Sequence, residues 1–178
     1  MSGNTALPEV VPLVRARSHD IERLLDAAFG ADRHGRTAYR LREGVTPIPD
    51  LSFAAFDEDG RLVGSLQSWP IALREADGGV TPLVLVGPVA VTPDRQRGGL
   101  GRIMMERMLA EAEAEGADPL VLIGDPEYYG RFWGFSAECT GEWDAPGPFE
   151  PRRLLALSVD GRTIGGKGML SPRIAVAG

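Results

Sequence analysis

The chain has 178 residues, a length typical of one domain that can bury a sizeable hydrophobic core. Its formal net charge of −6 argues against nucleic acid as a bulk partner, because binding a phosphate backbone requires a broad basic face. The single cysteine, Cys139, excludes an internal disulfide, and two separated histidines with that thiol make no metal-ligand cluster. The composition therefore predicts neither a nucleic-acid-binding protein nor a metal centre.

The N-terminal region contains neither a signal-peptide pattern nor a long apolar stretch. No basic segment precedes an apolar one there, and no run approaches the roughly 18 apolar residues that a membrane span needs. We therefore expect one domain over residues 1–178, without a membrane segment and located in the cytoplasm. Residues 1–9 are expected to form a loose tail.

The first expected elements are a strand and two helices. Residues 10–17 alternate in hydropathy as a strand does, and Ser18 is a candidate N-cap for a helix that ends near Gly30. Residues 31–44 are polar and rich in arginine, and we expect a second helix there.

A hairpin and an interrupted apolar strand follow. Residues 51–56 and 61–69 flank Asp57-Glu58-Asp59-Gly60, whose composition predicts a hairpin turn. A third strand and the turn Asp77-Gly78-Gly79 then lead to residues 83–91, which are apolar on both faces as in a central strand. Gly87-Pro88 interrupts this stretch, which predicts a strand bulge, or alternatively two strands joined by a tight turn.

A basic, glycine-rich turn connects the interrupted strand to a helix. Residues 96–101 contain three glycines, and Arg95, Arg97 and Arg102 add positive charge around them. A helix N-terminus offers unpaired N–H groups, and glycine lets a phosphate approach the backbone closely. The turn is therefore either a site for a phosphorylated ligand or a turn that binds nothing. Its residues match neither the P-loop of nucleotide triphosphatases nor the dinucleotide-binding fingerprint.

The second half of the chain alternates between further helices and strands. Residues 103–115 have an apolar helical face and end at Gly116 as C-cap, and residues 120–123 form a short buried strand. Residues 144–151 contain three prolines and form a loop, residues 154–159 a late strand, and the glycine-rich tail has no assigned element. This order alone indicates an α/β or α+β fold.

Two motifs resemble the GCN5-related N-acetyltransferase (GNAT) family. Gln96-Arg97-Gly98-Gly99-Leu100-Gly101 fits the family pattern Gln/Arg-x-x-Gly-x-Gly/Ala. Residues 124–135 contain Gly-Asp-Pro, two tyrosines and Gly-Phe, and resemble members of the bacterial YhbS-like type. The resemblance covers residues 10–136 and is best over 83–135. It implies a mixed, mostly antiparallel sheet with a bulged central strand, flanked by helices on both faces.

The resemblance implies acetyl-coenzyme A as co-substrate and no metal. The glycine-rich turn would wrap the pyrophosphate, and the pantetheine arm would lie where the bulge splays the fourth strand from the fifth. A backbone N–H between Val89 and Val91 would polarise the thioester carbonyl. The implied cofactor-binding residues are Val89, Ala90, Val91, Gln96, Arg97, Gly98, Gly99, Leu100, Gly101 and Arg102.

The resemblance also implies a tyrosine as general acid. A phenol, with a pKa of roughly 10, is protonated at neutral pH and can protonate the departing thiolate. By position this role falls to Tyr129, with Tyr128 second, unless both tyrosines are packing residues. Trp133 makes the span from Tyr129 to Gly134 one residue longer than the family pattern. Either the short helix bulges, or the register shifts so that Tyr128 or no tyrosine faces the thiol.

The implied reaction is direct attack of an amine on the thioester, with Asp125, Glu127 or a water chain as base. The acceptor would be a small-molecule or peptide amine, and the resemblance also allows a homodimer. In the family, the region of residues 31–44 forms one wall of the acceptor site, where its arginines would be either a solvated helix face or a contact for an anionic substrate group. These are Arg33, Arg36, Arg40 and Arg42.

Two other functions stay open on the sequence. One is a non-catalytic module that binds or senses acetyl-coenzyme A, since Trp133 is additional and no base is evident. The other is a protein that holds a different phosphorylated ligand on the same turn.

Overall fold

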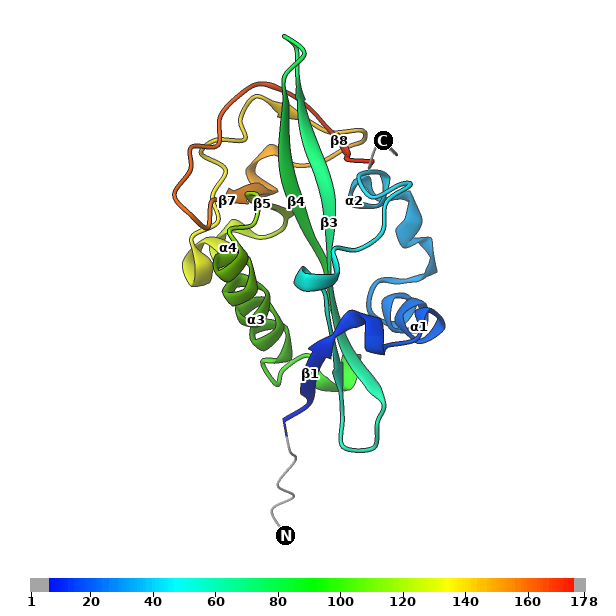
Figure 1. Ribbon diagram of the computed structural model, residues 1–178. Helices are drawn as coiled ribbons and strands as arrows, with labels where there is room; N and C mark the ends of the chain where they lie inside the picture. The colour runs from blue at the N-terminus through cyan, green and yellow to red at the C-terminus, as the bar shows by residue number, and fades with distance from the viewer. Residues whose placement is uncertain (1–6, 175–178) are drawn as a thin grey trace.

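The computed structural model describes residues 7–174 and has a long β-hairpin at its centre (Figure 1). Six of the residues expected as a loose tail, 1–6, lie outside the described residues, and Glu9 already belongs to a strand. The helices are α1 (Ser18–Phe29), α2 (Thr37–Arg40), α3 (Leu100–Glu115) and α4 (Pro126–Trp133). The strands are β1 (Glu9–Pro12), β2 (Phe53–Phe56), β3 (Leu62–Glu75), β4 (Val80–Val91), β5 (Leu120–Ile123), β6 (Trp143–Asp144), β7 (Leu154–Leu157) and β8 (Gly168–Pro172).

The strands of residues 7–174 form one sheet in the order β1-β2-β3-β4-β5-β7, and β8 pairs with both β3 and β6. Only the β4–β5 and β6–β8 pairs are parallel, so the sheet is mixed and mostly antiparallel, as expected. Helices α1 and α2 lie on one side of the β3–β4 hairpin, and α3 and α4 lie on the other (Figure 1). The expected fold, with helices on both faces, is therefore confirmed.

The side chains along each strand point alternately to the two faces of the sheet, and hydrophobic core residues lie on each face. Phe53 and Ala55 of β2 pack toward α3, whereas Ala54 between them packs toward α1, because successive residues of a strand face opposite sides. The α3 side contains the methionines Met104, Met105 and Met108, all nearly fully buried. Burial of these two apolar stripes fixes both helices against the hairpin.

The expected bulge in the central strand is confirmed by the register of β3 and β4. Leu66 pairs with Val89 and Ser68 with Val86, so the two residues Gly87 and Pro88 face the single residue Gln67. Gly87 has a φ of 129°, a conformation that side chains rarely adopt, which explains glycine at this position. The parallel pairing of β4 with β5 includes only Val84 and Leu85, so it ends just before the bulge.

Two expected strands have different bounds in the structure. The strand expected over 10–17 ends at Pro12, and a 3-10 turn over Leu13–Arg15 then leads into α1. The separate third strand is wrong, because β3 continues without interruption to Glu75. Pro70 is tolerated within β3 because its carbonyl accepts from the Arg173 N–H, so its nitrogen faces the edge between β2 and β8.

Three helix expectations also need correction. Arg17 and not Ser18 occupies the N-cap of α1, and Ser18 begins the helix. The helix expected over 31–44 is a 3-10 turn over Ala31–Gly35 followed by the four residues of α2, with extended Arg36 between them. Helix α3 begins at Leu100, three residues before the expected start. Along the described chain, no helix has the length and apolar character that crossing a membrane would require.

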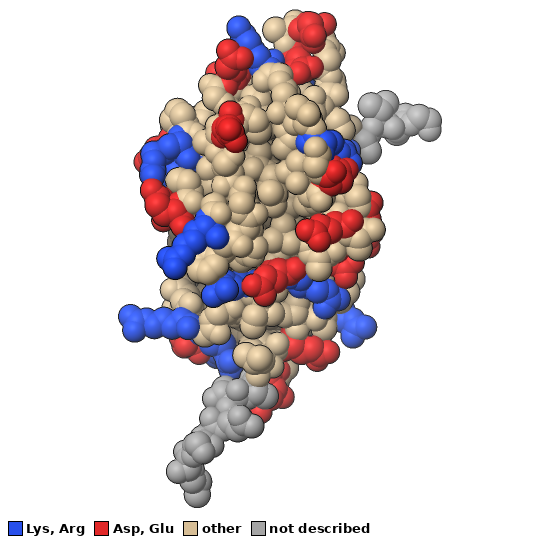
Figure 2. Space-filling model, turned by 90° about the vertical axis from the view of Figure 1, so that its left-hand side faces the viewer, with Lys and Arg blue, Asp and Glu red and all other residues tan. Residues whose placement is uncertain are grey.

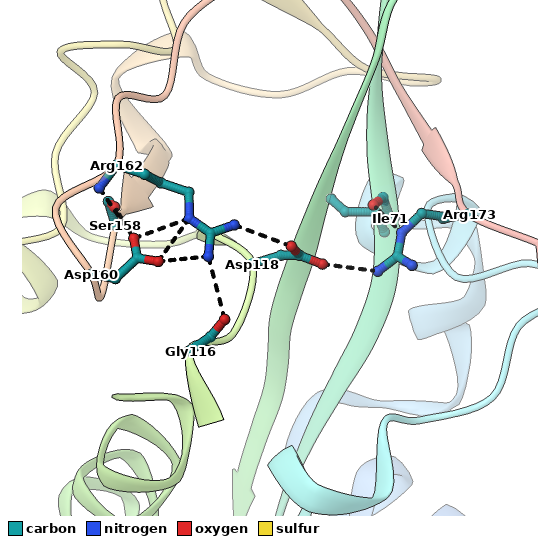
Figure 3. A network of polar contacts seen from close by, with 7 residues as sticks. All are labelled: Ile71, Gly116, Asp118, Ser158, Asp160, Arg162 and Arg173. Carbon is teal, nitrogen blue, oxygen red and sulfur yellow. Dashed lines mark hydrogen bonds and ion pairs between the residues drawn. The ribbon is translucent and has the colours of Figure 1, made fainter. Parts of the chain in front are cut away.

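The glycine-rich tail, for which no element was expected, is fixed by β8 and by a polar network (Figure 3). The Arg162 guanidinium donates to Asp160, to Asp118 and to the Gly116 carbonyl at the end of α3. Asp118 also forms an ion pair with Arg173, whose Nε donates to the Ile71 carbonyl of β3. The network connects the end of α3, the segment before β5 and the C-terminal segment to the sheet.

We expect the Arg162→Gln substitution to raise the pKa of Asp160. Hydrogen bonds from the Arg162 side chain and backbone lower this pKa from 3.8 to about 2. The Asp160 pKa is depressed in the folded protein, so its stabilisation is present above the unfolded value and is lost as pH falls from about 4 toward 2. Carboxyl NMR titration should show the pKa moving toward 3.8 in this variant. An unchanged value would contradict the assignment, and Arg61→Gln is the control, because Arg61 pairs with Asp57 and Asp94 instead.

Candidate active site

A pocket of about 630 Å³ lies where β4 and β5 diverge at the bulge. Its floor comes from Val86, Gly87, Pro88 and Val89 of β4 and from Leu122 and Ile123 at the end of β5. The side facing α1 includes Phe29 and residues 36–39, and the far side includes residues 148–150 and Arg153. We call this space the bulge pocket.

A second pocket of about 480 Å³ lies along the glycine-rich turn, and we call it the loop pocket. Both pockets are lined by Phe29, Val89, Met105 and Tyr129, so they adjoin at these residues. Together they give a continuous path from the start of α3, past the bulge, to the wall formed by α2. A long ligand with a phosphate at one end fits such a path.

Two glycines determine the shape and position of the glycine-rich turn: Gly99 within it and Gly64 on the neighbouring strand β3. Gly99, at the N-cap of α3, has a φ of 77° and no side chain to cap the helix, so the first N–H groups of α3 have no side-chain acceptor there. Gly64 of β3 was not singled out by the sequence, yet a Cβ there would lie 3.0 Å from the Leu100 side chain. The absence of that Cβ lets the first turn of α3 pack closely on β3.

Seven of the ten expected cofactor-binding residues line the loop pocket. Of the other three, Ala90 is buried on the face that packs against α1, and Leu100 is buried in the core beneath α3. Gly98 donates its N–H to the Arg95 carbonyl. The seven lining residues are Val89, Val91, Gln96, Arg97, Gly99, Gly101 and Arg102.

Tyr129 lies at the junction of the two pockets. It belongs to α4, which begins after the N-cap Asp125 with Pro126 in the first turn. Its ring packs against Phe135, with ring centroids 6.3 Å apart. Burial raises the pKa of its phenol, and nearby Tyr128 raises it further. No hydrogen bond is made to this hydroxyl by any residue from 7 to 174.

Tyr128 lines only the loop pocket and is 36% exposed. Its ring contacts those of Phe132 and Trp133 edge-on, with centroids 5.1 and 5.5 Å away. Helix α4 remains α-helical through Trp133, and Gly134 closes it with an N–H bond to the Gly130 carbonyl. The extra Trp133 is therefore accommodated at the end of a regular helix without a bulge, and Tyr129 nevertheless lines both pockets.

The two candidate base carboxylates lie outside both pockets. Asp125 accepts the Glu127 N–H at 3.1 Å and so caps α4. Glu127 forms an ion pair with Arg152, and contacts with Asp125, its own backbone and Arg152 lower its pKa. Glu150 is the acidic residue that lines the bulge pocket. Among residues 7–174, no group of three His, Cys, Asp or Glu residues is placed to hold a metal.

The four arginines of residues 31–44 have different environments. Arg33 is 1% exposed and binds Glu22, Asp26 and the Tyr39 hydroxyl, so it fixes α1 to the segment after it. Arg40 is exposed and donates to the Pro146 carbonyl. Of these four arginines, only Arg36 and Arg42 line the bulge pocket. Arg153 lines the bulge pocket as well, and no sequence motif pointed to it.

The surface that includes α3 and α4 shows acidic and basic side chains interspersed, without a broad basic area (Figure 2).

A family model described as an acetyltransferase (GNAT) domain matches residues 10–136. The chain therefore belongs to the GNAT acetyltransferase family, as the motifs in residues 96–101 and 124–135 predicted. An uncharacterized N-acetyltransferase of Streptomyces avermitilis is 30% identical over 137 residues, 76% of this chain and 32% of that protein. The uncharacterized N-acetyltransferase YhbS of Escherichia coli K12 is 28% identical over 112 residues, 63% of this chain and 64% of YhbS. The chain thus spans less than two thirds of the length of these curated relatives.

Solved structures of the family share this fold over almost the whole chain. The crystal structure of Escherichia coli YhbS in complex with CoA superimposes with a TM-score of 0.71 at 21% identity, covering 97% of this chain and 94% of YhbS. A GNAT family acetyltransferase of Brucella melitensis, in complex with acetyl-CoA, gives a TM-score of 0.64 at 23% identity, covering 93% of this chain and 96% of that protein.

We expect the Gly124→Ala substitution to displace Tyr129. A Cβ on Gly124 would lie 2.5 Å from the Tyr129 ring, closer than such atoms approach, and the ring is held by packing. Overpacking of this kind costs about 1–3 kcal/mol of unfolding free energy, measurable by urea denaturation. Gly141→Ala is the matched control, because nothing lies within 4 Å of its added Cβ. Equal stability of the two variants would show that the Tyr129 ring is not held as described.

Proposed function

We propose that the protein transfers the acetyl group of acetyl-coenzyme A to an amine. The single observation that carries this proposal is the position of Tyr129, whose phenol lies where the loop pocket meets the bulge pocket. Membership of the GNAT family and the CoA and acetyl-CoA complexes of the two structural neighbours support the same donor.

The donor would lie along both pockets. The pyrophosphate would bind at residues 96–101, where Gln96, Arg97 and the unpaired N–H groups of the first turn of α3 line the loop pocket. The pantetheine arm would occupy the space between β4 and β5 that begins where their pairing ends at Leu85. The thioester carbonyl would then accept a hydrogen bond from a backbone N–H between Val89 and Val91. Ala90 and Leu100 would contribute through their backbones, since both side chains are buried elsewhere.

The reaction would proceed by direct attack and need no enzyme nucleophile. The amine nitrogen bonds to the thioester carbon, the carbon–sulfur bond breaks, and Tyr129 donates its proton to the departing sulfur. The raised pKa of Tyr129 keeps this phenol protonated until that step. Asp125 and Glu127 line neither pocket, so the acceptor nitrogen would lose its proton to a water chain, the other base that the sequence left open. Water then returns a proton to Tyr129.

We expect the Tyr129→Phe substitution to lower kcat by about 10²–10⁴-fold, the usual contribution of a general acid. The dissociation constant of acetyl-coenzyme A should stay nearly unchanged, because the ring remains. Thiol release over a panel of amines measures the first quantity, and calorimetry measures the second. Tyr128→Phe is the matched control and should retain turnover, since Tyr128 does not line the bulge pocket.

Three results would contradict parts of this proposal. Full turnover of Tyr129→Phe would remove the general-acid role. Binding of acetyl-coenzyme A by the unmodified protein without thiol release from any amine would favour a sensory module. Absence of binding would favour another phosphorylated ligand.

A further inference from the structure

The Arg42 guanidinium contacts two aromatic rings in the wall of the bulge pocket. Its central carbon is 3.7 Å from the centroid of the Tyr39 ring and 4.5 Å from that of Trp69. One edge donates to the Gln67 amide oxygen at 3.2 Å. Contacts with two rings and a hydrogen bond on one edge restrict the position of the guanidinium.

The contacts of Arg42 connect it to the bulge itself. The Trp69 indole N–H donates to the Gly87 carbonyl at 2.8 Å. Gln67 is the β3 residue that faces Gly87 and Pro88 across the bulge. Trp69 and Gln67, two of the three side chains that contact Arg42, are therefore fixed by the part of β4 beside which the thioester would lie. Arg42 is consequently positioned relative to the reaction centre, and not only to α2.

Arg42 has no carboxylate partner among residues 7–174, in contrast to several other arginines. Arg33 pairs with Glu22 and Asp26, and Arg152, the neighbour of Arg153, pairs with Glu127. Its guanidinium donates instead to the neutral amide of Gln67. Partial burial lowers the Arg42 pKa, yet a guanidinium remains charged at neutral pH. The carboxylate of Glu22, which pairs with Arg33, acts on Arg42 only through space and raises its pKa. A half-buried guanidinium that no carboxylate of residues 7–174 contacts favours an anion that enters the pocket.

The other charged residues that line the bulge pocket are mainly basic. Arg36 and Arg153 also line it, and neither lies within 4 Å of a carboxylate of the described chain. Glu150 is the acidic lining residue. Three arginines and one glutamate make this pocket cationic in a chain whose net charge is −6. Such a pocket concentrates anionic ligands over cationic ones.

We propose that the acceptor carries a carboxylate as well as the reacting amine, and that Arg42 binds this carboxylate. The inference rests on the proposed function, because it names the acceptor of that reaction. A guanidinium presents its free N–H groups in one plane, which matches a planar carboxylate, and contacts with Tyr39 and Trp69 restrict this one. Arg42 is thus a specificity-determining residue, and the substrate class is an amino carboxylic acid.

The test compares amines that differ only by a carboxylate. Lysine with cadaverine, arginine with agmatine and tyrosine with tyramine form matched pairs, and phosphoethanolamine tests for a phosphate instead. We expect kcat/KM for thiol release to be about 10–100-fold higher for the carboxylate member of the accepted pair, the range of a charge-assisted contact. The Arg42→Gln variant should lose this preference through KM, with kcat and acetyl-coenzyme A affinity retained. Arg42→Lys should restore part of it.

A matched control and a second measurement keep the inference separate from the proposed function. Arg40→Gln removes a nearby arginine that lines neither pocket and should keep the preference. NMR of the Trp69 indole N–H, which stacks on Arg42, should show shifts when the amino acid is titrated into the CoA-bound protein. These shifts should be absent with the matched amine and in Arg42→Gln.

Each outcome decides at least one of the two claims. Equal kcat/KM for both members of every pair would overturn the carboxylate site while leaving the transferase intact, as would preference for phosphoethanolamine. Thiol release from none of these acceptors, together with Trp69 shifts that depend on Arg42, would overturn the proposed reaction but support the anion site. Absence of both would overturn both claims.

Discussion

The bulge at Gly87 and Pro88 is the constraint on which the rest of the site depends. Two residues of β4 face one residue of β3 there, and the parallel pairing of β4 with β5 ends just before it. The backbone of β4 beyond Val86 is therefore without a neighbour on the β5 side, and the space becomes the bulge pocket. A regular strand would continue to pair with β5 and would close that space.

The surrounding elements are positioned relative to this interruption. The indole N–H of Trp69 donates to the carbonyl of Gly87 at the bulge, and the Trp69 ring in turn stacks on Arg42. On the other side, Gly64 allows α3 to approach β3, which brings the glycine-rich turn next to Val89 and Val91. Gly124 leaves the space that the Tyr129 ring occupies. The absence of a side chain at Gly64 on β3 and at Gly124 just after β5 therefore determines where these pocket-lining groups lie.

Local patterns in the sequence predicted much of the fold, whereas contacts between distant residues were not accessible to them. The hairpin turn at 57–60, the bulge, the C-cap at Gly116 and the turn at 96–101 each depend on neighbouring residues, and the structure contains them all. Strand β8 was missed because its residues are held by β3 and β6 and not by their own pattern. The stacking of Arg42 on Trp69 and the lining position of Arg153 likewise depend on packing between elements.

A crystal structure of the protein with coenzyme A tests most directly whether the interrupted strand forms the donor site. We expect the pyrophosphate to bind the backbone N–H groups of residues 96–101 and the pantetheine arm to lie between β4 and β5. The sulfur should lie within hydrogen-bond reach of the Tyr129 hydroxyl. Coenzyme A bound away from the bulge, or with its sulfur remote from Tyr129, would contradict the account.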